Sequence, residues 1–221
     1  MKLVEILPPI ILKSRKKLLD KLIPERHVKK QIKNLQKETL FDGDDLLFKR
    51  LIFSSKVYAE IGCGQSTVYV CSLKSEGPEK VICVDSSNEW LKLVASLSIA
   101  KTPLLHHVDF GVLSDWGRPI SYAGIDKVED YAGLIFKEAN PDLILIDGRF
   151  RVYCFCVCIN LSEPGTKILF DDYVGRPYYS IIEKIIKPSE TCGRQALFVR
   201  PDKIDQGLVE SMIVNFKYVM D

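Results

Sequence analysis

The stretch EIGCGQST (Glu60–Thr67) decides the fold prediction, because an apolar run ends there in an acid, two glycines and two hydroxyl side chains. The residues before it, KVYA at 56–59, have the β-branched and aromatic character of a strand. Glycines after a strand let the main chain approach a ligand closely, since they carry no Cβ. The first N–H groups of a following helix have no partners within the helix and can face the same ligand. The stretch therefore predicts a ligand-binding turn between a strand and a helix.

This turn departs from the two common nucleotide-binding loops. A dinucleotide-binding turn reads G-x-G-x-x-G/A, whereas Thr67 stands at its third small position, and a triphosphate loop needs a G-K-[ST] that does not follow. Glu60 at the end of the strand repels a pyrophosphate and attracts an ammonium group. Asp85 ends the next apolar run, where an acid accepts hydrogen bonds from ribose hydroxyls. The two acids and the glycines together predict a site for S-adenosylmethionine.

Short apolar runs alternate with helical stretches along the rest of the chain. The predicted strands are Lys56–Ile61, Lys80–Asp85, Leu104–Phe110, Asp142–Asp147, Lys167–Asp172 and Arg194–Arg200. The predicted helices are Ser66–Ser75, Asn88–Ala100, Phe150–Leu161 and Pro177–Ile186. The last apolar run, Ser211–Val219, is expected to return as an antiparallel edge strand. The alternation is typical of an α/β fold whose mostly parallel sheet carries helices on both faces.

Length and charge restrict the class of protein further. The 221 residues suffice for one core, so we predict a basic helical N-terminal extension at 1–50 and one domain at 51–221. The net charge of +2 is too balanced to indicate nucleic acid by itself. Basic residues concentrate in Lys13–Lys37, which is either an exposed helical face or a surface for phosphate-bearing partners.

The same composition indicates the compartment. No apolar run reaches the ~20 residues that a membrane span requires. Seven cysteines, most of them in apolar surroundings, favour a reducing environment, so we expect a cytoplasmic protein. Cys154, Cys156 and Cys158 are interpreted as buried thiols, because no second Cys or His pair stands at zinc spacing.

The motifs resemble those of a known superfamily. Residues 57–200 resemble a class I S-adenosylmethionine-dependent methyltransferase, with Glu60–Gly64 matching its first motif, E/D-x-G-x-G, and Asp85 its second-strand acid. The segments EIGCGQST, DWGRP, PDLILIDGRFR, GTKILFDDYVGRPYY and GRQALF also resemble a poorly characterised group of small, mostly bacterial methyltransferase-like proteins. The resemblance implies a Rossmann-like fold with a seven-stranded sheet.

The residues expected to bind the cofactor lie at the ends of the first four predicted strands or just after them. They are Glu60, Gly62, Cys63, Gly64, Ser66, Thr67, Asp85, Ser86, Asp109 and Asp147. Asp109 follows the third strand, where this superfamily contacts adenine, and Trp116 is expected to form the wall of a pocket. The stretch from there to Tyr131, which also carries Tyr122, is expected to be a long loop, either a lid over substrate or a surface loop held by its aromatic residues.

Three carboxylates are expected to converge beside the reacting methyl group. Asp147 ends the fourth predicted strand, Asp171 and Asp172 end the fifth, and these strands are neighbours in the usual methyltransferase order. Acids gathered in this way share protons, bind a cation, or divide into ligand and base. The layout is similar to that of the macrocin-type sugar O-methyltransferases, a resemblance that implies Mg²⁺ held by all three.

The general base is not carried over from that family. Its members have D-G-D after the fourth strand, and Arg149 stands at the second acid in the segment DGRFR. The predicted substrate-binding residues are Arg149, Arg151, Trp116 and Arg176, since guanidinium groups suit a phosphate or carboxylate. The predicted catalytic residues are Asp147, Asp171, Asp172 and Tyr173. In the absence of a metal, the candidate proton acceptors are Tyr173, His106 and His107.

These features predict O-methylation of a small hydroxylated acceptor, such as a sugar, a glycoconjugate precursor or another metabolite. One alternative is methylation of RNA or protein through the basic extension, against which no N-P-P-Y-type tetrad follows the fourth strand. Another is a protein that binds S-adenosylmethionine without catalysis, which the missing acid at Arg149 leaves open. The identity of the acceptor and a homo-oligomeric state are also left open.

Overall fold

The computed structural model describes residues 24–37 and 39–221, and the chain divides into two compact units, Met1–Lys37 and Glu38–Asp221. The described residues of the first unit include the helix α2 (Pro24–Leu35). Residues 1–23, including part of the basic segment, lie outside the described residues. The boundary falls earlier than the predicted residue 51, because Leu40, Leu47 and Phe48 are buried in the second unit.

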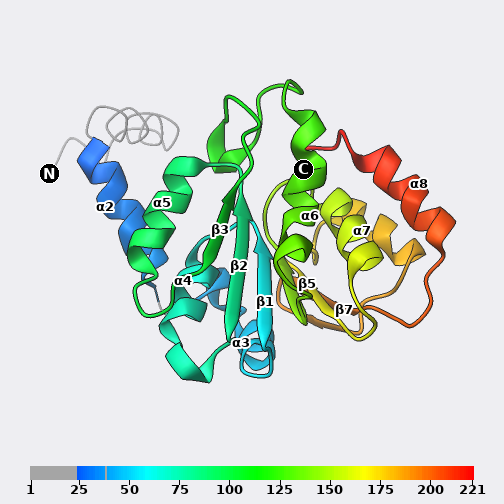
Figure 1. Ribbon diagram of the computed structural model, residues 1–221, viewed down its shortest axis with the longest axis horizontal. Helices are drawn as coiled ribbons and strands as arrows, with labels where there is room; N and C mark the ends of the chain where they lie inside the picture. Colours follow the sequence, from blue (N-terminus) through cyan, green and yellow to red (C-terminus); the bar gives the residue numbers. More distant parts are fainter. Residues whose placement is uncertain (1–23, 38) are drawn as a thin grey trace, which may run out of the picture. The chain divides into compact units, whose positions relative to one another are not determined.

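Seven strands within residues 39–221 form one sheet in the order β3-β2-β1-β4-β5-β7-β6 (Figure 1). The strands are β1 (Val57–Ile61), β2 (Lys80–Asp85), β3 (Leu104–His107), β4 (Leu143–Ile146), β5 (Lys167–Phe170), β6 (Glu190–Cys192) and β7 (Gln195–Val199). The first five are parallel, and β7 runs antiparallel between β5 and β6. The order reverses between β1 and β4, and ligands of open α/β sheets bind at the carboxyl ends of the strands beside such a reversal.

Helices cover both faces of this sheet (Figure 1). On one face lie α3 (Leu46–Ile52), α4 (Gln65–Ser72) and α5 (Asn88–Leu97), and on the other α6 (Val128–Glu138) and α7 (Arg151–Leu161), with α8 (Gln206–Phe216) packed on α7. The 3₁₀ helices are η2 (Phe41–Gly43), η3 (Lys74–Glu76), η4 (Asp115–Gly117), η5 (Ile125–Lys127) and η6 (Pro177–Lys184). The predicted mostly parallel sheet with helices on both faces is confirmed.

The central strands read as continuous apolar runs because both of their faces are buried. Ile144 and Ile146 of β4 belong to the core that includes α6 and α7, whereas Leu143 and Leu145 face the opposite side. Glu60 of β1 is the exception, a carboxylate with no exposed surface in the middle of this sheet. A buried acid at such a position requires specific partners.

The predicted edge strand at Ser211–Val219 is wrong. Most of this run belongs to α8, whose N-terminus is capped by Asp205, because its carboxylate accepts a hydrogen bond from the Leu208 N–H at 3.0 Å. Val209 and Met212, three residues apart on one helix face, are buried against the core. The edge strand is instead the short polar β6, which forms a hairpin with β7.

The predicted loop before Tyr131 contains a helix that the sequence analysis missed. Tyr131 lies in α6 with 1% of its surface exposed, and its ring packs edge-to-face on Phe110. Tyr122 stays exposed and donates its hydroxyl hydrogen bond to the Tyr218 carbonyl at 3.1 Å. Tyr131 is thus a core residue and not part of a lid.

No helix in the described ranges has the length and apolar character that a membrane crossing requires. Cys154, Cys156 and Cys158 are free, fully buried thiols on α7, as predicted.

Candidate functional site

The buried carboxylate of Glu60 holds the turn between β1 and α4 in place through hydrogen bonds. One carboxylate oxygen of Glu60 accepts a hydrogen bond from the Ser66 hydroxyl, and the other accepts one from the Thr67 hydroxyl at 2.8 Å. The Thr67 hydroxyl in turn accepts the Gly64 N–H at 3.0 Å, which fixes the start of the helix. The predicted hydroxyls therefore surround Glu60, and this carboxylate supports the turn from inside rather than presenting itself to solvent.

Burial raises the pKa of Glu60 from 4.5 to about 7, although the hydrogen bonds from Ser66 and Thr67 oppose the shift. Between pH 4.5 and 7 the folded protein holds this proton and the unfolded chain releases it, so the free energy of unfolding falls as pH rises. We expect Glu60 to contribute a decline of about 3 kcal/mol at most across this window. Glu60→Gln should remove that decline when urea unfolding is compared across the window. An unchanged pH slope in the variant would contradict the assignment.

Asp85 at the end of β2 has 8% of its surface exposed and holds the other side of the turn. Its Oδ2 accepts the Cys63 N–H at 3.1 Å, and its Oδ1 accepts the Ser87 N–H at 2.8 Å. Burial raises the pKa of Asp85, and the hydrogen bonds from the main chain oppose this shift. A carboxylate has about four lone-pair positions, so each oxygen keeps capacity for a ligand hydroxyl.

The two glycines of the turn have different roles. Gly62 has φ +91°, and a Cβ on it would lie 2.4 Å from Gly148, the residue after Asp147, so the loops that follow β1 and β4 are in close contact there. A Cβ on Gly64 would meet only Trp90, at 3.9 Å. Only Gly64 therefore leaves open space for a ligand beside the turn, whereas Gly62 is required by the neighbouring loop.

A pocket opens between this turn and the ends of β4 and β7. Its lining residues are Leu40, Phe41, Gly64, Gln65, Ser66, Asp147 and Arg194. Three of them, Gly64, Ser66 and Asp147, are among the predicted site residues. Leu40, Phe41, Gln65 and Arg194 were missed. Leu40 and Phe41 come from the segment before β1, which has no recognised motif, whereas Gln65 and Arg194 lie in the quoted segments EIGCGQST and GRQALF without a role having been predicted for them.

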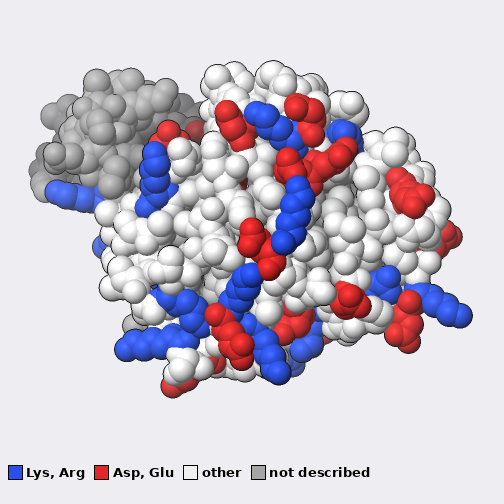
Figure 2. Space-filling model, viewed as in Figure 1, with Lys and Arg blue, Asp and Glu red and all other residues white. Residues whose placement is uncertain are grey.

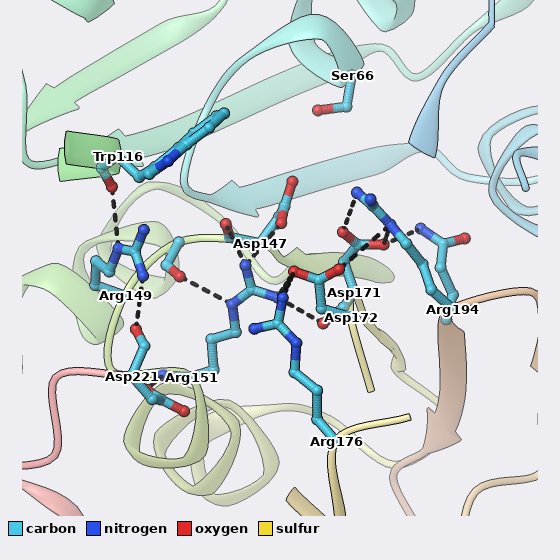
Figure 3. A network of polar contacts seen from close by, with 12 residues as sticks. Ser66, Trp116, Asp147, Arg149, Arg151, Asp171, Asp172, Arg176, Arg194 and Asp221 are labelled. Carbon is cyan, nitrogen blue, oxygen red and sulfur yellow. Dashed lines mark hydrogen bonds and ion pairs between the residues drawn. The ribbon is translucent and has the colours of Figure 1, made fainter. Parts of the chain in front are cut away.

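The three predicted carboxylates converge (Figure 3). Asp147, Asp171 and Asp172 each offer an oxygen atom, and these oxygens lie within 4.8 Å of one another. Burial, together with the neighbouring Asp171 carboxylate, raises the pKa of Asp147 well above its usual range, whereas Arg151 lowers it. The adjacency of β4 and β5 produces this cluster, as the sequence analysis expected.

Arginines compensate the charge of these acids. Arg151 donates to Asp147 Oδ1 at 3.0 Å and lies 3.3 Å from Asp172 Oδ2, and Arg176 donates to the same oxygen of Asp172 at 2.7 Å (Figure 3). Arg194 donates hydrogen bonds to both carboxylate oxygens of the fully buried Asp171, to Oδ1 at 3.1 Å and to Oδ2 at 2.6 Å. Three guanidinium groups thus form ion pairs with three carboxylates.

This arrangement does not fit Mg²⁺, which needs carboxylate oxygens free to coordinate it in an octahedron. Arg194 holds both oxygens of Asp171, and Arg151 holds one oxygen of Asp147. The expected magnesium site is therefore not supported by the side chains that surround it.

Arg149 and Arg151 have different surroundings from those expected for substrate ligands. Arg151 is 6% exposed and fully engaged by the protein, so the substrate contact expected for it is not supported. Arg149 donates to the Trp116 carbonyl at 3.0 Å and to the Asp221 carbonyl at 3.1 Å. The Trp116 side chain is 88% exposed beside this contact, and Arg176 is partly exposed.

Ser86 and Asp109 shape the loops after β2 and β3. The Ser86 hydroxyl donates to the Gly117 carbonyl at 2.9 Å, which holds the loop that carries Trp116. Asp109 is exposed and accepts the Gly111 N–H at 2.8 Å. Both residues thus lie at the strand ends where the cofactor is expected.

The alternative proton acceptors do not join the pocket lining. The Tyr173 hydroxyl donates to Glu183 at 2.8 Å, and burial raises the pKa of Tyr173. His106 Nε2 lies 3.4 Å from a Glu138 carboxylate oxygen, and His107 Nε2 contacts the Ser86 carbonyl at 3.1 Å. Among the candidates for proton acceptor, Asp147 is the one that lines the pocket.

The strand order, the glycine turn after β1 and the acid at the end of β2 are those of the class I S-adenosylmethionine-dependent methyltransferase fold, which was the fold predicted. A methyltransferase-like protein from Silicibacter pomeroyi is similar to this chain, with a TM-score of 0.71 and 26% identity over 84% of this chain and 99% of that chain. No protein-family model matches the sequence, and no curated protein does.

Weaker similarities involve two further methyltransferases. NodS, an N-methyltransferase from Bradyrhizobium japonicum solved with S-adenosyl-L-homocysteine, matches with a TM-score of 0.49 and 12% identity over 80% of this chain and 97% of that chain. An RNA methyltransferase from Salinibacter ruber matches with a TM-score of 0.42 and 11% identity over 75% of this chain and 93% of that chain. Similarities at this level do not extend to substrate.

Proposed function

We propose that this protein is a methyltransferase that uses S-adenosylmethionine to methylate a hydroxyl group of a small acceptor, such as a sugar or a glycan precursor. The observation that carries the proposal is the pocket that joins the open side of Gly64 to the Asp147 carboxylate. When bound, the cofactor supplies a methyl group on a positively charged sulfur. Gly64 and Ser66 are proposed to line its binding site, and Asp85 to accept its ribose hydroxyls.

Asp147 is proposed to take the proton of the acceptor hydroxyl as its oxygen bonds to the methyl carbon and the bond from that carbon to sulfur breaks, which leaves S-adenosylhomocysteine. Its carboxylate lines the pocket, and one of its oxygens is held by Arg151. A positioned base and a held acceptor are the two contributions that a protein makes to this displacement. Trp116, exposed beside Arg149, is proposed to pack against a bound ring of cofactor or acceptor.

The face drawn in Figure 2 gives no support to a polyanionic substrate, whereas the described part of the first unit carries the exposed Lys29, Lys30, Lys33 and Lys37. Figure 2 shows lysine, arginine and acidic side chains interspersed on one face, without a continuous basic area in the part described. Proteins that bind nucleic acid neutralise several phosphates with clustered lysine and arginine. Binding to RNA that weakens steeply with added salt would favour the alternative acceptor.

The cofactor site is tested by melting experiments with S-adenosylhomocysteine, with NAD as the control ligand. A ligand at about 100 times its Kd stabilises by about 2.7 kcal/mol, which is a Tm rise of about 5–10 °C for a domain of this size. Gly64→Val should abolish the rise and leave the Tm without ligand almost unchanged. The reason is that a Cβ on Gly64 would meet only Trp90, at 3.9 Å, and the valine side chain would enter the pocket.

Two results would contradict the proposal. One is the absence of any shift with the nucleoside in the unmodified protein. The other is an equal shift in the protein and in Gly64→Val, which would move the ligand away from this turn. A shift without methyl transfer to any free or nucleotide-linked monosaccharide would favour a binding protein instead.

A further inference from the structure

The Arg151 guanidinium is surrounded by oxygen atoms, as a bound metal cation would be. A guanidinium group has five N–H donors. Arg151 donates to three main-chain carbonyls, of Asp147 at 3.2 Å, Gly148 at 3.0 Å and Asp171 at 2.6 Å. It also donates to carboxylates of Asp147 at 3.0 Å and Asp172 at 3.3 Å. Its five donors therefore meet five oxygen atoms.

These oxygens come from the loops after two neighbouring strands. Asp147 and Gly148 follow β4, whereas Asp171 and Asp172 follow β5. Divalent cations such as Ca²⁺ and Mg²⁺ gather six or more oxygens, including carboxylates and main-chain carbonyls, from separate parts of a chain. The Arg151 guanidinium gathers the same kinds of ligand, although it carries a single charge.

The Arg151 guanidinium is buried, and its position is fixed by its contacts. Arg151 is 6% exposed, and the surrounding acids, Asp147 first among them, raise its pKa although burial opposes this. Its main-chain N–H, at the first position of α7, donates to the Asp221 carboxylate at 2.8 Å. The residue is thus held at its backbone and at every donor of its side chain.

We propose that Arg151 is a built-in cation that takes the place of a divalent metal ion among Asp147, Asp171 and Asp172 and holds the Asp147 carboxylate toward the pocket. Arg151 is then a positioning residue, and the acid cluster binds no Mg²⁺. The part of this proposal that concerns methyl transfer rests on the proposed function, whereas the part that concerns metal binding does not.

The first test uses the unmodified protein and the metal ions alone. We expect Mg²⁺ and Mn²⁺ to leave the Tm unchanged, and EDTA to change neither the Tm nor the shift caused by S-adenosylhomocysteine. A Tm rise with either metal that EDTA reverses would overturn the proposal. Loss of the nucleoside shift would instead concern the proposed function, so the two failures are distinguishable.

The second test removes the cation. Arg151→Met takes the cation away from the Asp147 carboxylate and from the carbonyls of Asp147, Gly148 and Asp171, whereas Arg176 and Arg194 still hold Asp172 and Asp171. The oxygens released around Asp147 should give this variant a metal response that the unmodified protein lacks. At ten times the Kd of Mg²⁺ the expected rise in Tm is about 3 °C or more. The control is Arg50→Met, a matched change in an exposed ion pair with Glu190, which should show no metal response. An Arg151→Met variant that folds and ignores Mg²⁺ would overturn the proposal.

A conservative variant separates positioning from charge and serves where Arg151→Met does not fold. Arg151→Lys keeps the positive charge, so it should remain insensitive to Mg²⁺, but three donors cannot reach five oxygens. Misplacement of a catalytic group by about 1 Å costs about 10²-fold in rate, so kcat should fall by that order while the Kd of S-adenosylhomocysteine stays unchanged. An unchanged kcat, or a parallel loss of nucleoside binding, would contradict a positioning role.

Discussion

Asp147→Asn is expected to lower the rate of methyl transfer by about 10²–10⁴-fold, the usual contribution of a general base. The amide keeps the size of the side chain and an oxygen for Arg151, 3.0 Å away, but it cannot take a proton. The rate is measured as S-adenosylhomocysteine formed with the best acceptor in a panel of free and nucleotide-linked monosaccharides. The Kd of S-adenosylhomocysteine should stay unchanged, since Gly64 and Asp85 are retained.

The matched control for this substitution is Asp130→Asn. Asp130 is an exposed acid of α6 paired with Lys137 at 2.9 Å, away from the pocket lining. Its loss should leave the rate as it is. If Asp147→Asn loses no more activity than Asp130→Asn, Asp147 does not accept the proton.

Gly148→Ala is expected to lower both stability and nucleoside binding. A Cβ at Gly148 would lie 2.3 Å from the Tyr131 hydroxyl oxygen, 3.0 Å from the Ile61 carbonyl oxygen and 3.1 Å from the Gly62 Cα. Overpacking of this kind costs about 1–3 kcal/mol, and the displaced Gly62 belongs to the turn proposed to bind the cofactor. Urea unfolding measures the first effect, and the Tm shift with S-adenosylhomocysteine measures the second.

The chain offers a matched control for this glycine. Gly133 lies within α6, and a Cβ there would meet nothing within 4 Å, so Gly133→Ala should stabilise by up to about 1 kcal/mol. Adding Tyr131→Phe to Gly148→Ala removes the closest contact and should restore part of the stability. Equal, harmless effects of both alanine substitutions would show that the loops after β1 and β4 do not pack as described.

Much of the fold could be predicted because strands and turns leave local patterns. Five of the six predicted strands extend no more than two residues beyond the observed ones, since apolar runs with β-branched residues end at acids or glycines. The prediction for Ser211–Val219 was wrong because the helix cap, Asp205, lies upstream of the apolar run. The missed β6 is three residues long and polar, and its pairing with β7 specifies it.

The convergence of Asp147, Asp171 and Asp172 could be predicted from the strand order that the resemblance implied. The arginines that compensate the charge of these acids could not be predicted. Arg194 enters from the β6–β7 hairpin, and nothing in the segment GRQALF indicates a bidentate contact with Asp171. Three acids expected at one site indicated that cations must accompany them. The sequence did not identify which arginines would pair with these acids.

The amino-acid sequence alone determined the α/β class, the glycine turn and the acids at the ends of the strands, because these depend on neighbouring residues along the chain. Only the tertiary structure decided the partners of those acids: Glu60 is enclosed by hydroxyls, and Arg151 occupies the position where a metal ion was expected. The physical reason is that a buried charge is stabilised by whatever the folded chain brings within a few ångströms, and those groups come from segments that are distant in the sequence.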